Sequence, residues 1–164
     1  MRASPIAAMD RVQLVRDLKE YSGRGEEEIL VPAGEYIVGA VASRKVRWFG
    51  RSVWWVRFRI TDVGEHHGRE LFAYWNVIPR GSRVSRSYEI AKAYVIATAL
   101  KPPKHLAQLS PMEFLGGCLF RAKVDYVRRD TSGVERPIEA SYSKVDFLIE
   151  RVAGNPPCLV RRQG

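Results

Sequence analysis

The sequence has few of the features that would place the protein outside the cell or in a membrane. It contains only two cysteines: Cys118 lies in an apolar stretch and Cys158 in a Pro-rich tail, which does not suggest a disulfide framework. No apolar run approaches the length of about 18 residues that a membrane span needs. No basic region followed by an apolar block stands at the N-terminus. We therefore expect a cytoplasmic protein that makes no use of a membrane.

Residue patterns that support catalysis or cofactor binding are also missing. Neither glycine-rich phosphate loop occurs, G-x-x-x-x-G-K-[ST] or G-x-G-x-x-G. The adjacent His66 and His67 do not converge readily on one metal, and His105 and the two cysteines lack the spacing of a structural zinc site. The carboxylates are scattered. We expect a protein that is not an enzyme and that holds no metal and no cofactor.

Acidic residues are scarce relative to basic ones. The 164 residues carry a formal charge of +9, and the isoelectric point is about 9.9. The positive excess lies within residues 29–164, because residues 1–28 hold more acidic than basic side chains. Such a charge favours a polyanionic partner. The alternative is that the charge only keeps the protein soluble.

One strand-like run combines a core face with an aromatic and basic face. Side chains alternate along a strand, so Trp54, Val56, Phe58 and Ile60 share one apolar face. The opposite face carries Trp55, Arg57 and Arg59. An aromatic ring beside cations is typical of a surface that binds single-stranded nucleic acid. The alternative is that Trp55 packs under an N-terminal segment and the arginines only solubilise this face.

The hydrophobic pattern predicts five strands and one main helix. The helix follows the third strand and ends at Lys101-Pro102-Pro103, and a short capped helical turn follows at 110–116. In the last strand we expect Val145, Phe147 and Ile149 to point inward. The expected strands cover about 35–46, 53–62, 71–78, 119–128 and 141–152.

The fold class that this order predicts is mainly β with helices. A five-stranded, partly open barrel with a helix between strands 3 and 4 is the OB-fold order. The alternative is another small β-barrel or roll with an inserted helix. We expect a helical arm and linker at 1–28, an OB-like nucleic-acid-binding domain at 29–153 and an irregular C-terminal tail at 154–164.

Basic and aromatic residues occur where OB-folds bind oligonucleotides, on strands 2 and 3 and on the 1–2 and 4–5 loops. Either Tyr74 or Trp75 must face outward, because the two are adjacent in one strand. Trp48 could instead fold back as a hydrophobic cap, and Arg128 and Arg129 could be solvated turn residues. The candidate nucleic-acid-binding residues are Trp55, Arg57, Arg59, Arg44, Lys45, Arg47, Trp48, Arg51, Tyr74, Trp75, Arg121, Lys123, Arg128 and Arg129.

A second basic stripe leads into the predicted helix and contains Arg80, Arg83, Arg86 and Lys92. It is either an exposed helix face or an extension of the path for a nucleic-acid backbone. In a third interpretation, Arg83 and Arg86 face a partner protein.

Four segments between residues 32 and 128 carry a resemblance to a known group. They are 32–36 (PAGEY), 56–62 (VRFRITD), 68–72 (GRELF) and 109–116 (LSPMEFLG). Together they resemble small phage and plasmid proteins of the OB type, single-stranded-DNA-binding-like proteins of replication or recombination modules. The resemblance implies DNA binding during replication, repair or mobile-element transfer. Replicative relatives of the bacterial type usually end in an acidic tail, whereas this chain ends in a short basic stretch, which favours an accessory role.

The leading hypothesis is a non-enzymatic protein that binds single-stranded DNA through stacking on Trp55 and through phosphate contacts of the arginines. The first alternative is an interaction module whose exposed Trp55 and basic loops bind a replication or conjugation protein. The second is an RNA-binding protein, since stacking tolerates both nucleic acids. A homo-oligomer is also open. Coverage of this aromatic face by the N-terminal helix or by a second subunit would favour the interaction module.

Overall fold

The computed structural model describes residues 31–48, 50–127 and 142–160. The predicted N-terminal helical arm, its linker and the two arginines of the 4–5 connection, Arg128 and Arg129, lie outside these residues. The elements are, in chain order, β1 (Gly34–Trp48), β2 (Arg51–Ile60), β3 (Glu70–Asn76), α2 (Glu89–Thr98), the 3-10 turn η2 (Leu106–Gln108), α3 (Met112–Leu115), β4 (Leu119–Val127), β5 (Tyr142–Ala153) and α4 (Pro157–Val160).

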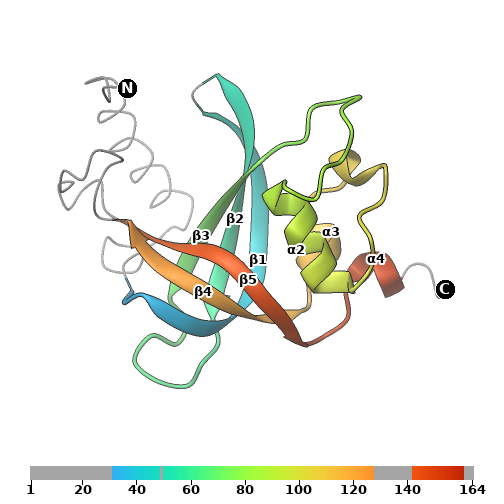
Figure 1. Ribbon diagram of the computed structural model, residues 1–164. Coiled ribbons are helices and arrows are strands. Elements are labelled where there is room, and N and C mark those ends of the chain that lie inside the picture. Colours follow the sequence, from blue (N-terminus) through green and yellow to red (C-terminus); the bar gives the residue numbers. More distant parts are fainter. Residues whose placement is uncertain (1–30, 49, 128–141, 161–164) are drawn as a thin grey trace.

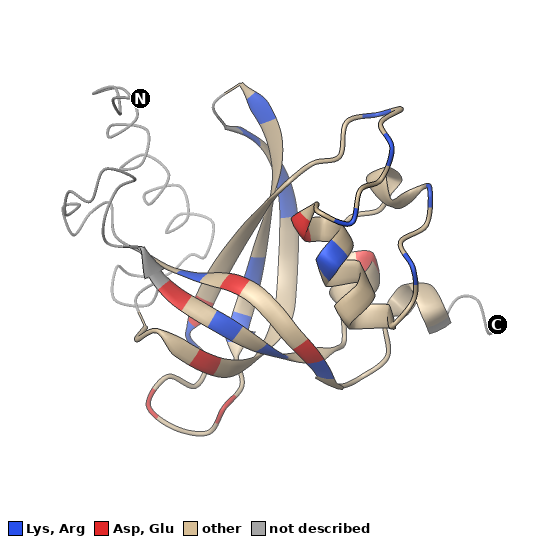
Figure 2. Ribbon diagram, in the orientation of Figure 1, with Lys and Arg blue, Asp and Glu red and all other residues tan. Residues whose placement is uncertain are grey.

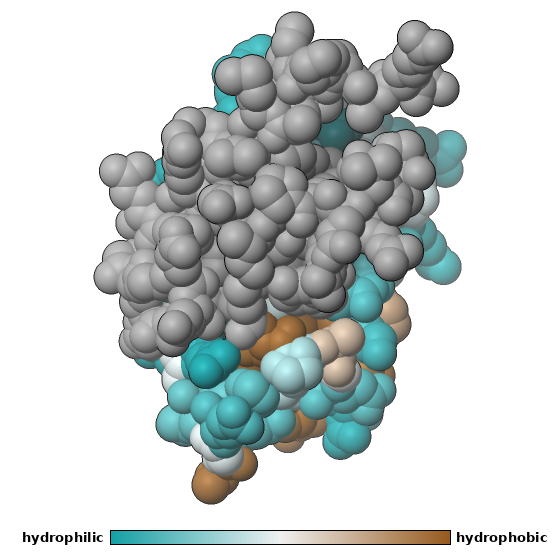
Figure 3. Space-filling view, turned by 90° about the vertical axis from the view of Figure 1, so that its left-hand side faces the viewer, coloured by the Kyte–Doolittle hydropathy of each residue, from teal (hydrophilic) through white to brown (hydrophobic). Residues whose placement is uncertain are grey.

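The five strands form a closed barrel in the order β1-β2-β3-β5-β4 (Figure 1). Every neighbouring pair is antiparallel except β3 and β5, which run parallel and meet at Phe72 and Lys144. The prediction of a mainly β chain is therefore confirmed. The helices gather on one side of the barrel, beside the end where β1 and β2 form a hairpin. On the side seen in Figure 3 most of the described surface is hydrophilic, with some hydrophobic surface among the polar residues.

The alternation predicted for β2 and β4 places their apolar faces in the core. Val56, Phe58 and Ile60 are fully buried, and so are Phe120 and Val124 on β4. A buried hydrogen-bond pair joins the entry of β1 to β5: the Val31 N–H donates to Ser143 Oγ (2.7 Å), and this hydroxyl donates to the Val31 carbonyl (2.8 Å).

The inward face of β5 differs from the prediction. Val145 is buried, but Phe147 is 51% exposed and Leu148 is buried in its place. The β4–β5 register skips Asp146, since Val124 pairs with Val145 and Lys123 with Phe147. Such a bulge shifts the alternation by one residue. The prediction that Phe147 points inward is therefore wrong.

Local backbone conformation and side-chain hydrogen bonds mark the ends of the helical elements. α2 stops at Ala99, which adopts a left-handed φ of 58°, before the two prolines at 102 and 103. At α3 one of the two hydrogen bonds of the predicted capping box is present: the Ser110 N–H donates to Glu113 Oε2 (2.7 Å), whereas no side chain caps the first turn. The C-terminal tail, predicted to be irregular, contains the short helix α4.

Because of the bulge in β5, substitutions at the neighbouring residues Phe147 and Leu148 should affect stability differently. Leu148→Ala removes a side chain that is 7% exposed and should lower the free energy of unfolding by about 2–4 kcal/mol. Phe147→Ala should change it by less than about 1 kcal/mol, because this ring is half exposed. Urea unfolding of the two variants measures both values. The reverse order would show that β5 keeps regular alternation.

Candidate nucleic-acid interface

The outer face of β2 does not offer a free aromatic ring. Trp55 lies on the face opposite the core, as the alternation predicts, but it is only 4% exposed. Its strand neighbours are Arg44 and Tyr74, and the Arg44 guanidinium carbon lies 5.6 Å from the centre of the Trp55 ring. Alternation determines the face on which a side chain lies, but not whether water reaches that face. The prediction that Trp55 stands exposed for base stacking is therefore wrong.

The two arginines beside Trp55 interact with a buried carboxylate. Glu70 on β3 is 2% exposed, and its oxygens lie 3.6 Å from Arg57 Nε and 3.2 Å from an Arg59 terminal nitrogen. Arg59 also pairs with Glu70 in the β2–β3 register. A buried charge needs such partners. Both arginines, which we expected to follow phosphates, therefore lie within ion-pair distance of Glu70.

The remaining strand candidates are separated from one another. Tyr74 is the outward member of its pair and is half-buried, whereas Trp75 is 5% exposed and belongs to the core. On β4, Arg121 is exposed and lies 3.3 Å from Glu150, and Lys123 is half-buried. Trp48 ends β1, and its side chain is outside the described part.

A wide groove of about 1390 Å³ lies at the hairpin end of the barrel. One wall is the β1–β2 hairpin, with Lys45, Arg47 and Arg51. The other wall comes from the segments that follow β3 and α2, including Arg80 and Lys104. Figure 2 shows basic residues on the hairpin and on the loops beside the helices, whereas the β2–β3 loop at the other end of the barrel carries acidic ones. Segments about 60 residues apart in sequence therefore share one basic groove.

The charge of the groove is strongly one-sided. Its lining includes five Lys and Arg residues, all of them exposed, and the single carboxylate of Glu113, which accepts the hydrogen bond of the Ser110 N–H. Within the described part of the chain, none of these five cations forms an ion pair. Arg47 also donates to the Gly50 carbonyl (3.1 Å), which holds the hairpin turn where Gly50 adopts a φ of 75°. The cations are lysines and arginines that a polyanion can reach.

Two aromatic side chains line the same groove. Trp54 lies on the core side of β2 but near the end of the barrel, so it is only half-buried, and Lys45 Nζ lies 5.1 Å from the centre of its ring. Tyr88, at the N-terminus of α2, is also half-buried. Trp54 and Tyr88 thus provide aromatic surface among the five cations.

The sequence pattern indicates one wall of this groove but not the other. Lys45, Arg47 and Arg51 were expected in the interface, and they line it. Trp54 was assigned to the core only, because its alternation matches Phe58. Arg80 belonged to the second basic stripe, and the sequence contains no local signal for Lys104. Only the packing of α2 and of the segment after it brings these residues together.

The described residues contain little else that suggests chemistry. They include no group of three or more His, Cys, Asp or Glu side chains that could hold a metal ion. Burial raises the pKa of the Cys118 thiol and that of the Tyr36 phenol, so both favour their protonated forms, and neither lines the groove. Among the helices described, none has the length and apolar character required to cross a membrane.

The ion pairs of the buried Glu70 should contribute more to stability than the exposed ion pair of Arg121 with Glu150. Glu70→Gln weakens a buried carboxylate–guanidinium contact and should lower the free energy of unfolding by about 1–3 kcal/mol. The matched change Glu150→Gln affects a pair that is 46% and 54% exposed, and should cost less than about 0.5 kcal/mol. Chemical denaturation compares them. Equal costs would mean that Glu70 is solvated.

Comparisons of the chain with protein-family models, with curated proteins and with solved structures found no match.

Proposed function

We propose that the protein binds single-stranded DNA in the groove between the β1–β2 hairpin and the segments after β3 and α2, and that it is not an enzyme. The observation that carries the proposal is the lining of this groove: five exposed cations with no ion-pair partner in the described part of the chain, around the half-exposed ring of Trp54. Cations along a groove with aromatic rings between them suit a strand whose bases are unpaired.

The strand order supports an OB-type barrel. In OB-folds five strands form a partly open Greek-key barrel that binds oligonucleotides through strands 2 and 3 and the 1–2 and 4–5 loops. Here the order is β1-β2-β3-β5-β4, and α2 follows β3 in sequence. The groove contains the 1–2 hairpin, and the resemblance to OB-type proteins of phage and plasmid replication modules agrees with this assignment. We propose a role in such a replication, recombination or mobile-element module.

Each part of the groove has a distinct task in this proposal. Lys45, Arg47 and Arg51 contact phosphates from the hairpin, and Arg80 and Lys104 contact them from the opposite wall. A base stacks on Trp54 where Lys45 now lies 5.1 Å from the ring centre. Lys45 then exchanges its contact with the ring for one with a phosphate, so the positive charge remains partnered. Sequence preference should be low, because every base has a face that can stack.

Binding should depend steeply on salt. Five phosphate contacts, each contributing about −0.7, give a slope of about −3 to −4 for the logarithm of the association constant against that of the salt concentration. Titration of labelled oligo-dT by fluorescence anisotropy at several salt concentrations measures it. A flat response with retained affinity would exclude phosphate contacts by these cations. Duplex DNA that binds as tightly as oligo-dT would indicate a nonspecific basic surface, and tighter binding of RNA would make RNA the ligand.

Substitutions at the two adjacent tryptophans distinguish DNA binding in the groove from DNA binding on the outer face of β2. Trp54→Leu keeps apolar bulk but removes the stacking surface, and should weaken oligo-dT binding by roughly five- to a hundredfold. Trp55→Leu is the matched control: it should lower the unfolding free energy by about 1–3 kcal/mol, because Trp55 is 4% exposed, and leave the affinity of the folded protein unchanged. Anisotropy titration and thermal unfolding measure both effects. Loss of binding in Trp55→Leu alone would place the DNA on the outer face of β2.

A further inference from the structure

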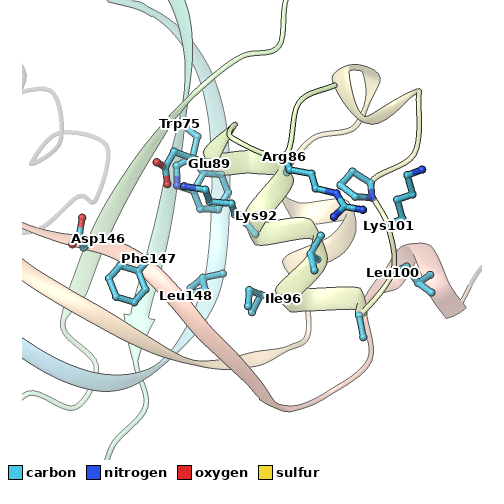
Figure 4. A pocket seen from close by; sticks show the side chains of 15 residues that line it. Trp75, Arg86, Glu89, Lys92, Ile96, Leu100, Lys101, Asp146, Phe147 and Leu148 are labelled. Atoms are coloured by element: carbon cyan, nitrogen blue, oxygen red, sulfur yellow. The ribbon is translucent and has the colours of Figure 1, made fainter. Parts of the chain in front are cut away.

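A second groove, of about 690 Å³, runs between α2 and β5 (Figure 4). Ile96 of α2, Leu148 of β5 and the buried Trp75 of β3 line it. It shares no lining residue with the basic groove at the hairpin end. It is therefore a separate site.

Exposed apolar side chains concentrate at this groove. Among the described residues five large apolar side chains are exposed, and three of them line it: Val95 (40%), Leu100 (41%) and Phe147 (51%). A contiguous apolar patch around a groove is typical of an interaction site, whereas single exposed apolar residues are ordinary.

A small basic pocket adjoins one end of the groove. Arg83, Arg86 and Lys101 line it, and no carboxylate does. Arg86 and Lys101 also line the apolar groove, and Figure 4 shows their side chains together at one end of it, with Phe147 toward the other. Within the described residues these three cations form no ion pair. They can therefore meet the carboxylates of a ligand.

β5 meets β3 at only one pair of residues beside the groove. β5 pairs with β4 over most of its length, but its register with β3 contains only Phe72 and Lys144. The backbone of Asp146–Leu148 therefore has no ladder with another described strand on the side of α2. α2 packs against β5 on this side, and the groove lies between the two elements.

We propose that this groove binds a peptide segment of a partner protein in which apolar side chains are followed by carboxylates. The apolar side chains fill the space between Ile96 and Phe147, and the carboxylates meet Arg86 and Lys101. The lining of the groove also includes Glu89, Lys92 and Asp146, so the complementarity to carboxylates is confined to its basic end, where no carboxylate lines the adjoining pocket. The site shares no lining residue with the DNA groove. Both ligands could therefore be bound at the same time.

The first test uses a fluorescein-labelled synthetic peptide of alternating Leu and Phe followed by a run of Asp with a free C-terminus. The control peptide has Asn in place of Asp and an amidated C-terminus. We expect the acidic peptide to bind at least about tenfold more tightly, because it alone supplies carboxylates to the basic pocket. A dissociation constant above about 1 mM for the acidic peptide, or equal binding of both peptides, would overturn the proposal.

The second test uses two exposed lysines that lie three positions apart but in different sites. Lys101→Glu should weaken binding of the acidic peptide by at least about fivefold and leave oligo-dT binding nearly unchanged. Lys104→Glu, the same change in charge, should do the reverse. If Lys101→Glu lowers oligo-dT affinity as much as Lys104→Glu does, and leaves peptide binding intact, the basic pocket belongs to the DNA path. If no variant binds oligo-dT, the DNA proposal fails and the peptide result still stands.

The third test concerns the apolar lining of the groove. Leu100→Asp should weaken peptide binding, whereas Val63→Asp, the corresponding change at a residue that is 99% exposed in the β2–β3 loop, should not. Sedimentation velocity on the same variants tests a different occupant. A dimer that Leu100→Asp converts to a monomer would show that a second copy of the chain covers the groove, and would overturn the peptide proposal.

Discussion

Closure of the barrel through β5 is the constraint on which the other features depend. This strand must pair antiparallel with β4 and also meet β3, so it has to bend. The β4–β5 register skips Asp146, Ile149 and Val152, and bulges of this kind supply curvature. The first of them turns Leu148 into the core and leaves Phe147 outside. β5 meets β3 at a single pair of residues, and α2 packs beside this junction. The apolar groove lies between α2 and β5.

The extension of β1 and β2 beyond the barrel has the second large consequence. β1 pairs with β4 only from Gly34 to Gly39, and its remaining part pairs with β2 alone as a hairpin. Trp54 lies where this hairpin leaves the barrel, so its ring is in contact with the core on one side and lines the basic groove on the other. A residue in the core pattern of a strand thus becomes half-exposed because the neighbouring strands end.

The positive charge of the protein serves at least two purposes. Arg57 and Arg59 neutralise Glu70 inside the sheet, where a lone carboxylate would be costly. The cations of the hairpin, together with Arg80 and Lys104, lie exposed around one groove. A net charge does not distinguish these two groups, because it counts a cation in an internal ion pair and a cation open to solvent alike. The division becomes visible only when burial and distances are known.

The sequence by itself determined the five strands, the main helix and the sign of the surface charge. The alternation in β2 and β4, the turn residues and the capping pair of Ser110 and Glu113 are local signals, and charge is a sum over composition. Only the tertiary structure decided that Trp55 is covered, that Leu148 replaces Phe147 in the core, and that Lys45 and Lys104 share a groove. A bulge shifts alternation without a strong local signal. The meeting of segments about 60 residues apart depends on how the barrel closes and where α2 packs, and the local pattern of neither segment contains that information.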